Sequence, residues 1–284
     1  MRLVLLGTAA LSPQPERMGP AVALENEGRI VVVDAGRGVS AQLVRAGLDP
    51  HGVTDVLVTH FHIDHVCDLA DLLYCAWHYV ERDPVRVAGP PGMEDFVERL
   101  LALHALDIRS RVVEFAALGK PARVWDDVRV VEVEPGPVEG PQDWHVRAER
   151  VEHGDSPYGI PGWTAWAYRL DAGGRSVVVS GDCRQSPGLA RLLDGGVDVL
   201  VQSLNWAGLD SWGLDVSGDW DARFADALFA DPQVLGRLAQ EKRVRHLVIT
   251  HFGVDPDLDG MAEVLSREYT GRLSFAEDLM SIQL

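Results

Sequence analysis

The stretch VTDVLVTHFHIDH, residues 53–65, decides what the rest of the chain must supply. Its first half is an apolar, β-branched run that predicts a buried strand. Its second half places His60, His62, Asp64 and His65 within six positions. Side chains two apart on an extended segment point to the same side, so His60 and His62 can reach one metal ion. The chain then turns towards an expected helix, which aims Asp64 and His65 at a second position nearby.

The mixture of imidazole and carboxylate in this stretch indicates the kind of metal. Such ligands suit Zn²⁺ or a neighbouring first-row metal, whereas Mg²⁺ and Ca²⁺ prefer shells of oxygen atoms. Histidines at the surface of a strand end, or histidines satisfied by hydrogen bonds in the core, are the alternative. Four such groups in six positions argue against it. Zn²⁺ is therefore the expected metal, with Mn²⁺ or Fe²⁺ as alternatives.

Three later strands are also expected to finish in a metal-binding side chain. His153 closes the run VRAERVEH, Asp182 closes RSVVVSGD, and His251 lies near the end of VRHLVITHF. Side chains gathered at one rim of a sheet can converge in space. The pattern therefore predicts one metal centre, built by residues far apart in the chain.

Length, composition and charge describe a globular protein of the α/β class. The chain has 284 residues, of which 46% are hydrophobic and 24% charged, which is too apolar for disorder. The absence of a long polar linker predicts a single domain, residues 1–284. The formal net charge of -17 repels phosphate and anionic membrane surfaces, and so argues against a nucleic-acid partner. We expect a small-molecule substrate instead.

Nothing in the sequence predicts export or a membrane segment. The apolar run at the N-terminus reaches Gly7 within six residues and lacks the features of a signal peptide. Apolar stretches are all shorter than the eighteen or so residues that a membrane helix needs. Cys67, Cys75 and Cys183 lack C-x-x-C spacing, which fits a reducing compartment. A cytoplasmic location is the expectation.

Strands are expected in groups, with helices between the groups. This order indicates sheets packed on each other with helices outside. β-branched runs predict strands at 29–36, 55–62, 84–90, 128–133, 146–153, 164–170, 175–182, 197–204 and 244–252. Apolar spacing of three and four predicts helices at 38–47, 68–80, 92–106 and 232–243.

With these residues in place, the chain resembles the metallo-β-lactamase fold superfamily. The matching marks are H-x-H-x-D-H at 60–65, the later His153, Asp182 after VVVSG, and His251. The resemblance runs through the whole chain and is strongest to the branch that holds ribonuclease Z, phosphodiesterases and arylsulfatase-like hydrolases. It implies an αββα sandwich: two mixed sheets with helices on the outer faces and two metal ions in a cleft at one edge.

The resemblance also implies a role for each ligand. His60, His62 and His153 would hold the first metal, Asp64, His65 and His251 the second, with Asp182 between them. Two zinc ions sharing a water lower the pKa of that water to about 7, which yields hydroxide as the nucleophile. Asp64 and His65 are the candidate catalytic residues, and Asp64 would orient the hydroxide and carry a proton to the leaving group. The family counterpart of Asp34 supports a ligating histidine; a turn residue before Gly36 is an equally weighted alternative.

Departures from ribonuclease Z affect the expected substrate. That family carries a histidine and a glutamate after the strand that follows the bridging aspartate, where this chain has Gln202 and Ser203. It also carries a further histidine before the last metal ligand, but 205–242 contains no histidine here. These differences and the acidic charge argue against tRNA 3′ processing, which we keep as an alternative.

Two other regions offer candidate substrate contacts. The segment that contains Trp206, Trp212 and Trp220 is interpreted as a lid or wall for a substrate ring; a homodimer contact or plain packing are the alternatives. His78, on the helix after the metal motif, is a candidate for the cleft, with a structural role as the alternative.

The sequence therefore predicts a metal-dependent hydrolase with a dinuclear centre that cleaves an ester-type bond of a small substrate. Phosphodiester, sulfate ester, carboxylic ester and lactone all fit. A biosynthetic enzyme that uses the same centre, with zinc or iron, on a carrier-bound or cyclic intermediate is an alternative. A di-iron redox enzyme is another, although His62 stands where di-iron members carry glutamate. A non-catalytic binding module is the third, and the complete ligand set argues against it.

Overall fold

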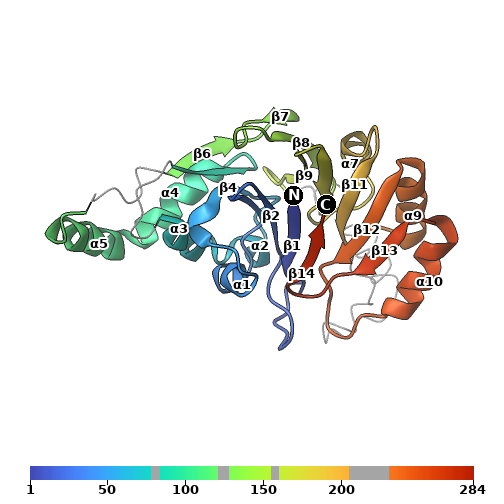
Figure 1. Cartoon of the computed structure of the whole chain (residues 1–284), viewed down its shortest axis with the longest axis horizontal. Helices are drawn as coiled ribbons and strands as arrows, with labels where there is room; N and C mark the ends of the chain where they lie inside the picture. The colour runs from blue at the N-terminus through green and yellow to red at the C-terminus, as the bar shows by residue number, and fades with distance from the viewer. Residues whose placement is uncertain (78–83, 121–127, 155–159, 205–229) are drawn as a thin grey trace.

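Two mixed sheets face each other in the middle of the molecule, and helices cover both outer faces (Figure 1). The structure is a computed structural model that describes residues 1–77, 84–120, 128–154, 160–204 and 230–284. The αββα sandwich expected from the sequence is confirmed. The two ends of the chain lie beside each other, because β1 and β14 pair in the first sheet.

The first sheet has the strand order β14-β1-β2-β3-β4-β5-β6. Its strands β3 to β6 run parallel, and the pairs from β14 to β3 run antiparallel. The bounds are β1 Arg2–Gly7, β2 Ala21–Asn26, β3 Arg29–Val33, β4 Val53–Leu57, β5 Val85–Gly89, β6 Val128–Glu132 and β14 Met280–Gln283.

The second sheet has the order β13-β12-β11-β10-β9-β8-β7 and repeats this division. Its strands β10 to β13 run parallel, and the pairs from β7 to β10 run antiparallel. The bounds are β7 Gly136–Val138, β8 His145–Val151, β9 Ala165–Ala172, β10 Arg175–Val179, β11 Val197–Ser203, β12 Val244–Thr250 and β13 Arg272–Phe275.

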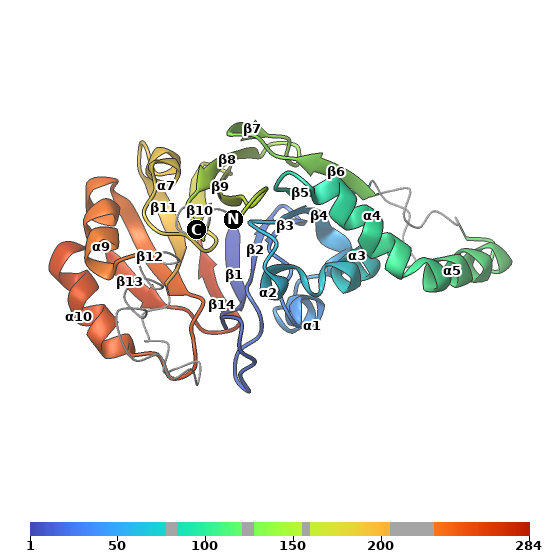
Figure 2. The same ribbon diagram turned by 180° about the vertical axis from the view of Figure 1, so that it is seen from behind.

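The helices divide between the two outer faces (Figures 1 and 2). In the described part of the chain, α1, α3 and α4 cover the first sheet, and α7, α9 and α10 cover the second. The helical bounds are α1 Val39–Arg45, η1 Pro50–Gly52, α2 Ile63–Val66, α3 Leu69–Trp77, α4 Met93–Leu103, α5 Ala105–Ala117, α7 Pro187–Leu192, α9 Pro232–Glu241 and α10 Leu258–Glu268.

Alternation along the strands explains why both faces of each sheet are buried. In β1, Leu3 and Leu5 point into the core between the sheets, while Val4 and Leu6 point to the helices. All four are fully buried. Each such side chain stabilises the fold by about 1.5–3 kcal/mol. A strand with a core on both sides reads as a continuous apolar run, as the sequence does here.

Most expected elements are present, with two informative differences. The helix expected at 92–106 is two helices, because the chain breaks at His104 between α4 and α5. The six-residue α7 and the eleven-residue α10 were not predicted, although each begins with a side-chain cap, from Ser186 and Asp257 respectively. The last three positions of the helix expected at 68–80 lie outside the described residues.

Candidate metal centre

The ends of strands from both sheets meet at one edge of the sandwich. His60 follows β4, His153 follows β8, Asp182 follows β10 and His251 follows β12. The two sheets are joined at this edge by a hydrogen bond of 2.9 Å from the backbone N–H of Trp166 to the Thr59 carbonyl oxygen. Because β8, β10 and β12 run in the same direction, their final residues reach this edge together.

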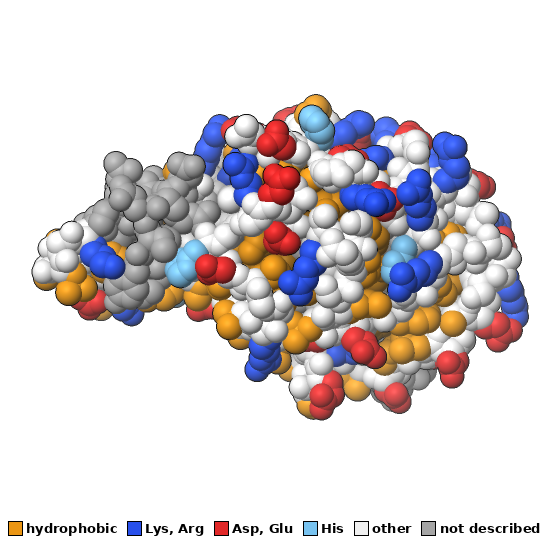
Figure 3. Space-filling view, viewed as in Figure 1, with side chains coloured by type: hydrophobic (Ala, Val, Ile, Leu, Met, Phe, Trp, Pro, Cys, Tyr) orange, Lys and Arg blue, Asp and Glu red, His pale blue; other side chains and the backbone are white. Residues whose placement is uncertain are grey.

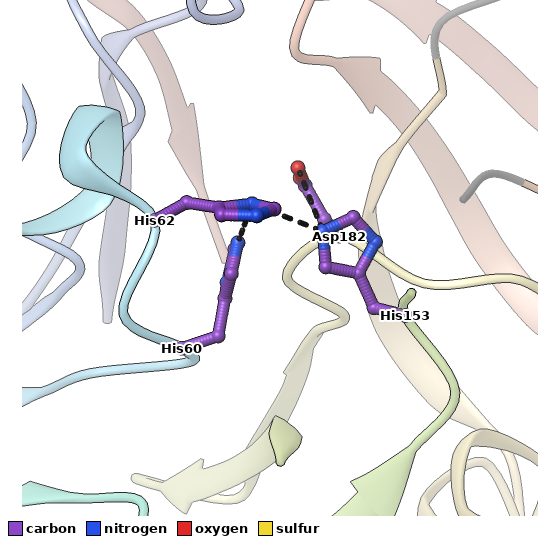
Figure 4. A group of neighbouring side chains, drawn as sticks. All are labelled: His60, His62, His153 and Asp182. Carbon is purple, nitrogen blue, oxygen red and sulfur yellow. Dashed lines mark hydrogen bonds and ion pairs between the residues drawn. The ribbon is translucent and has the colours of Figure 1, made fainter. Parts of the chain in front are cut away.

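Four of the predicted ligands form a first group, shown in Figure 4. The Nε2 atom of His60 lies 2.9 Å from Nδ1 of His62, and Nε2 of His153 lies 3.2 Å from that same atom. The Asp182 Oδ2 atom lies 3.9 Å from His153 Nε2. One ligand atom from each residue lies within 4.8 Å of all the others. Three imidazole nitrogens and a carboxylate oxygen are a typical donor set for Zn²⁺.

The other three predicted ligands form a second, fully buried group. His65 Nε2 and His251 Nε2 are 3.2 Å apart, and Asp64 Oδ2 lies 3.6 Å from the first and 3.4 Å from the second. Asp182 Oδ2 is also close, at 3.5 Å from His65 Nε2 and 3.3 Å from His251 Nε2. A single oxygen of Asp182 therefore lies between the two groups, where a bridging ligand would be.

The donor atoms fit metal ions better than they fit one another. Several ring nitrogens face each other at hydrogen-bond distance, which leaves lone pairs opposed unless a proton or cation lies between them. Asp182 Oδ1 is buried and accepts no hydrogen bond within the described part of the chain. A buried carboxylate oxygen without a partner is costly, and a cation would satisfy it.

The electrostatics of the first group favour cation binding. Burial lowers the pKa of His60 well below its ordinary value, and partial desolvation by the surrounding side chains lowers the pKa of His62 to about 4. Charges on neighbouring histidines act in the same direction. Both imidazoles are therefore neutral at pH 7, and each presents a lone pair to the site.

The two carboxylates remain ionised. Burial opposes the charge on Asp182, but the facing His251 and His65 outweigh burial and hold its pKa well below the ordinary range. Burial also opposes the charge on Asp64, and the hydrogen bond from His251 and the charge of His65 likewise lower its pKa. Neutral imidazoles beside ionised carboxylates make a site that attracts divalent cations.

Asp34 supports the ligands from behind. Its Oδ2 atom accepts hydrogen bonds from His65 Nδ1 and from the Thr59 hydroxyl, both at 2.8 Å, and its Oδ1 accepts from the Thr59 N–H at 2.8 Å. Burial opposes a charge on His65, but Asp182 and Asp34 outweigh it and raise the pKa of His65 well above its ordinary value. The Thr59 hydroxyl also lies 2.9 Å from His60 Nδ1. Asp34 thus contacts one ligand, His65, directly and reaches a second, His60, through Thr59. The sequence analysis named Asp34 as a candidate but did not identify Thr59.

Backbone strain accompanies the site. Asp34 and His251 adopt positive φ angles of 62° and 69°, and Gly181, just before the bridging position, has φ of 58°. For residues other than glycine this conformation costs about 1 kcal/mol or more. A β-carbon on Gly181 would lie 2.8 Å from Cβ of Thr59. These backbone conformations lower the stability of the fold and orient the ligands towards the centre.

The β1–β2 loop clamps the residue that follows His251. Phe252 donates its N–H to the Thr8 carbonyl at 2.8 Å, and its own carbonyl accepts from Ala10 N and from Gln14 Nε2 at 2.9 and 2.7 Å. These three bonds fix the chain directly beyond His251. They explain how an unfavourable backbone conformation persists at a ligand.

An aromatic wall not found by sequence analysis stands beside the first group. Trp163 donates its indole N–H to the His153 carbonyl at 2.7 Å. Its ring lies 4.6 Å from the ring of His62, which is the exposed member of the group, and 5.8 Å from that of His60. The sequence signal was its place between His153 and the start of a strand. The predicted substrate residues His78, Trp206 and Trp212 lie outside the described residues.

Comparison with known proteins agrees with this geometry. The sequence matches the family described as "Beta-lactamase superfamily domain" over residues 29–252. The chain belongs to the metallo-β-lactamase fold superfamily. It is a metal-dependent hydrolase of that superfamily. A protein named ribonuclease Z from Mycobacterium avium is 30% identical over 294 aligned residues, which cover 100% of this chain and 98% of the relative.

Solved structures show the same fold. Zn²⁺-bound PqqB from Methylobacterium extorquens aligns with a TM-score of 0.72 and 17% identity, covering all of both chains. The short form of human tRNase Z aligns with a TM-score of 0.70 and 21% identity, covering 100% of this chain and 99% of that one. Among the described residues, the helices are too short or too polar to cross a membrane.

Proposed function

We propose that this hydrolase holds two metal ions, with zinc as the preferred metal. It would use an activated water to cleave a phosphodiester-type bond of a small substrate. The observation that carries the proposal is the position of Asp182 Oδ2, within 3.3–3.9 Å of one nitrogen from each of His65, His153 and His251. An oxygen shared by two donor groups calls for two cations rather than one.

Different residues of the chain orient the metal ligands and transfer the proton. When bound, two zinc ions supply a water that ionises near neutral pH and positive charge opposite the developing oxyanion. Asp34 accepts a hydrogen bond from His65 Nδ1–H, which fixes the ring so that Nε2 faces the second group and would be the atom that binds a cation there. Asp64, which faces the same space, is the residue to which we assign proton transfer to the leaving group.

We assign access to the centre to the side of His62, the one exposed side chain among the seven ligands. His62 is exposed, whereas His60, His153 and Asp182 are all buried. Trp163 packs against His62 and presents an aromatic ring on this side. A substrate that arrives here meets the first group before the second, and the buried second group is shielded from bulk water.

The names of the relatives support a phosphorus-centred bond. The relative at 30% identity is a ribonuclease, and the aligned human structure is a tRNase. Both names denote enzymes that act on phosphodiester bonds. Two cations are also well suited to clamp the attacking and leaving oxygens of such a bond.

Ribonuclease Z activity itself is the second candidate, favoured by the coverage of the whole chain by those relatives. Two features weigh against it. Gln202 is buried and donates its amide to the Ser203 carbonyl at 3.0 Å, so it does not replace the expected histidine as a proton donor. The net charge of -17 disfavours a long polyanion.

A hydrolysis screen tests the proposal. Purified protein is assayed with bis(p-nitrophenyl) phosphate and with chromogenic sulfate, carboxylic ester and lactone substrates, with and without a chelator. We expect phosphodiester cleavage that the chelator abolishes and that added Zn²⁺ restores. A precursor tRNA with a 3′ trailer, assayed in parallel, decides between the small substrate and the second candidate.

Matched variants assign the activity to the centre. His62→Ala should remove the activity and one metal ion, whereas His51→Ala, an exposed histidine of η1, should keep both. Cleavage of another ester class alone would replace the phosphodiester assignment. Full activity in metal-free protein would refute the proposal altogether.

A further inference from the structure

A second candidate binding site lies at the opposite ends of the same strands. It is a hollow of about 410 Å³ where β10, β11 and β12 begin. We call it the arginine groove and define it by Ser176, Asp198, Arg243, Arg245 and the glycines at 174, 195 and 196. The seven residues of β12 separate it from His251, a distance of about 23 Å at about 3.3 Å per residue. The groove is therefore distinct from the metal centre.

The groove is positively charged in an acidic protein. Arg243 and Arg245 line it, Arg175 lies at its rim, and Asp198 is the single carboxylate among its lining residues. Figure 3 shows Lys and Arg side chains gathered over the part of the molecule that carries β8, β11 and β12. Since the whole chain carries -17, a local surplus of cations marks a place that attracts anions.

Asp198 positions the arginine side chains of the groove and does not neutralise all of their charge. Its Oδ1 atom accepts from Arg245 at 2.8 Å and lies 3.7 Å from Arg175, and its Oδ2 accepts from the Ser176 N–H at 2.9 Å. The carboxylate is only 12% exposed, whereas the Arg245 side chain is 75% exposed. Asp198 thus holds Arg245 from behind and leaves most of its guanidinium open to solvent.

Arg243 is an unused cation in a strained position. Its guanidinium makes no ion pair or hydrogen bond with any residue that the structure describes. Its φ angle is 54°, a conformation that residues other than glycine rarely adopt. Strain of this kind persists where the surrounding structure holds the backbone in place. The strained turn before β12 therefore positions Arg243 at the groove.

The glycines keep the floor of the groove open. A β-carbon added at Gly174 or Gly195 would meet no atom within 4 Å, so a side chain there would project into open space. Gly195 and Gly196 have consecutive positive φ angles of 85° and 90°. Backbone exposed in this way can approach an anion closely.

We propose that the arginine groove binds the phosphoryl group of a small molecule. Guanidinium groups match the geometry of phosphate oxygens and bind them through paired hydrogen bonds. The volume of about 410 Å³ leaves room for the rest of a small phosphorylated compound. A long polyanion is disfavoured by the charge of the whole chain.

Calorimetric titration of the zinc-loaded protein with inorganic phosphate tests this site. We expect two classes of site, since the metal centre also attracts phosphate. The double variant Arg243→Gln and Arg245→Gln should weaken one class by about tenfold or more. It should leave the other class, the hydrolytic activity and the thermal midpoint unchanged. His62→Ala should remove only the other class, so failure of the metal centre and failure of the groove give different results.

Arg267→Gln is the matched control, because Arg267 is an exposed arginine of α10 paired with Glu263. It should keep both classes. The proposal is overturned if the wild-type protein binds phosphate only at the class that depends on His62, or if the double variant binds like the wild type. It is also overturned if a single-stranded RNA binds the groove and phosphate does not compete with it.

Discussion

The two ends of the strands β10 and β12 solve opposite electrostatic problems. At their carboxyl ends, Asp182 and His251 are buried among other metal-binding side chains, and the site attracts cations. At their amino ends, exposed arginines surround a hollow that attracts anions. Burial makes the first end dependent on the exact partner of every polar atom, because an unpaired buried group is costly. Solvent makes the second end tolerant.

This difference orders the expected effects of substitution. At the buried end, partners behind the ligands orient two of them: Asp34 contacts His65, and Thr59 contacts His60. Removal of one member leaves the others misplaced and unpaired. At the exposed end, water replaces a lost partner, so effects should be confined to binding or to modest changes in stability.

The largest effect is expected for Asp182→Asn. The amide keeps the size of the side chain but removes the charge shared by the two groups, so two cations would no longer be balanced across them. We expect hydrolysis to fall about a thousandfold or more, by the loss of about 4 kcal/mol of transition-state stabilisation. Metal content, measured by mass spectrometry, should fall from two ions to one or none. Asp95→Asn, at an exposed aspartate of α4, should change neither value.

A smaller effect is expected for Asp34→Asn. The variant keeps a side-chain oxygen for the Thr59 N–H but loses the carboxylate that accepts from His65 Nδ1. Partners that hold a metal-ligating histidine typically contribute about 10–100-fold to metal affinity or activity. Titration of metal-free protein with Zn²⁺ against a competing chelator measures this loss. Unchanged affinity would show that Asp34 serves the turn alone.

The residues at the buried strand ends were also the easier ones to predict from the sequence. His60, His62, Asp64 and His65 could be identified because four metal-binding residues in six positions follow a strand pattern. His153, Asp182 and His251 could be proposed because each closes a β-branched run. The pairing of Asp182 with both groups depends on two sheets meeting, which no local pattern reports.

What could not be predicted is mostly tertiary. Trp163 reaches the centre because its indole finds the His153 carbonyl, and tryptophans that pack and tryptophans that line a site look alike in a sequence. The arginine groove combines residues from three strands whose order in the sheet is not encoded locally. Short helices such as α7 carry too few turns for a clear apolar period.

A moderate effect at the rim of the centre is expected for Trp163→Phe. The variant keeps an aromatic ring beside His62 but loses the hydrogen bond to the His153 carbonyl. One such bond contributes about 1 kcal/mol to the positioning of His153, so kcat/KM should fall by at most about fivefold. Steady-state kinetics with the best substrate of the screen measures it. Trp166→Phe is the matched control, because the buried Trp166 indole N–H has no hydrogen-bond partner among the described residues; equal losses in both variants would contradict the proposed role.

The smallest effect is expected near the amino ends, at His246 on β12. Burial and the nearby Arg272 lower the pKa of His246 to about 4, and its Nε2 lies 2.9 Å from the Ser274 hydroxyl. In the unfolded chain its pKa returns to about 6.5. Between these values the unfolded state binds the extra proton, so the contribution of His246 to stability is complete above about pH 6.5 and falls as the pH drops towards 4.

Comparison of wild-type protein with His246→Gln isolates this term from the titration of the metal ligands, which both proteins share. Urea unfolding at pH 7.5 and pH 5 gives the free-energy difference between them at each pH. The advantage of the wild type should be smaller at pH 5 by about 1 kcal/mol, after allowance for solvent screening at this strand end. An advantage that does not change with pH would mean that His246 takes up its proton in the folded state as readily as in the unfolded chain, so that even this end of the strand is less protected from water than its burial indicates.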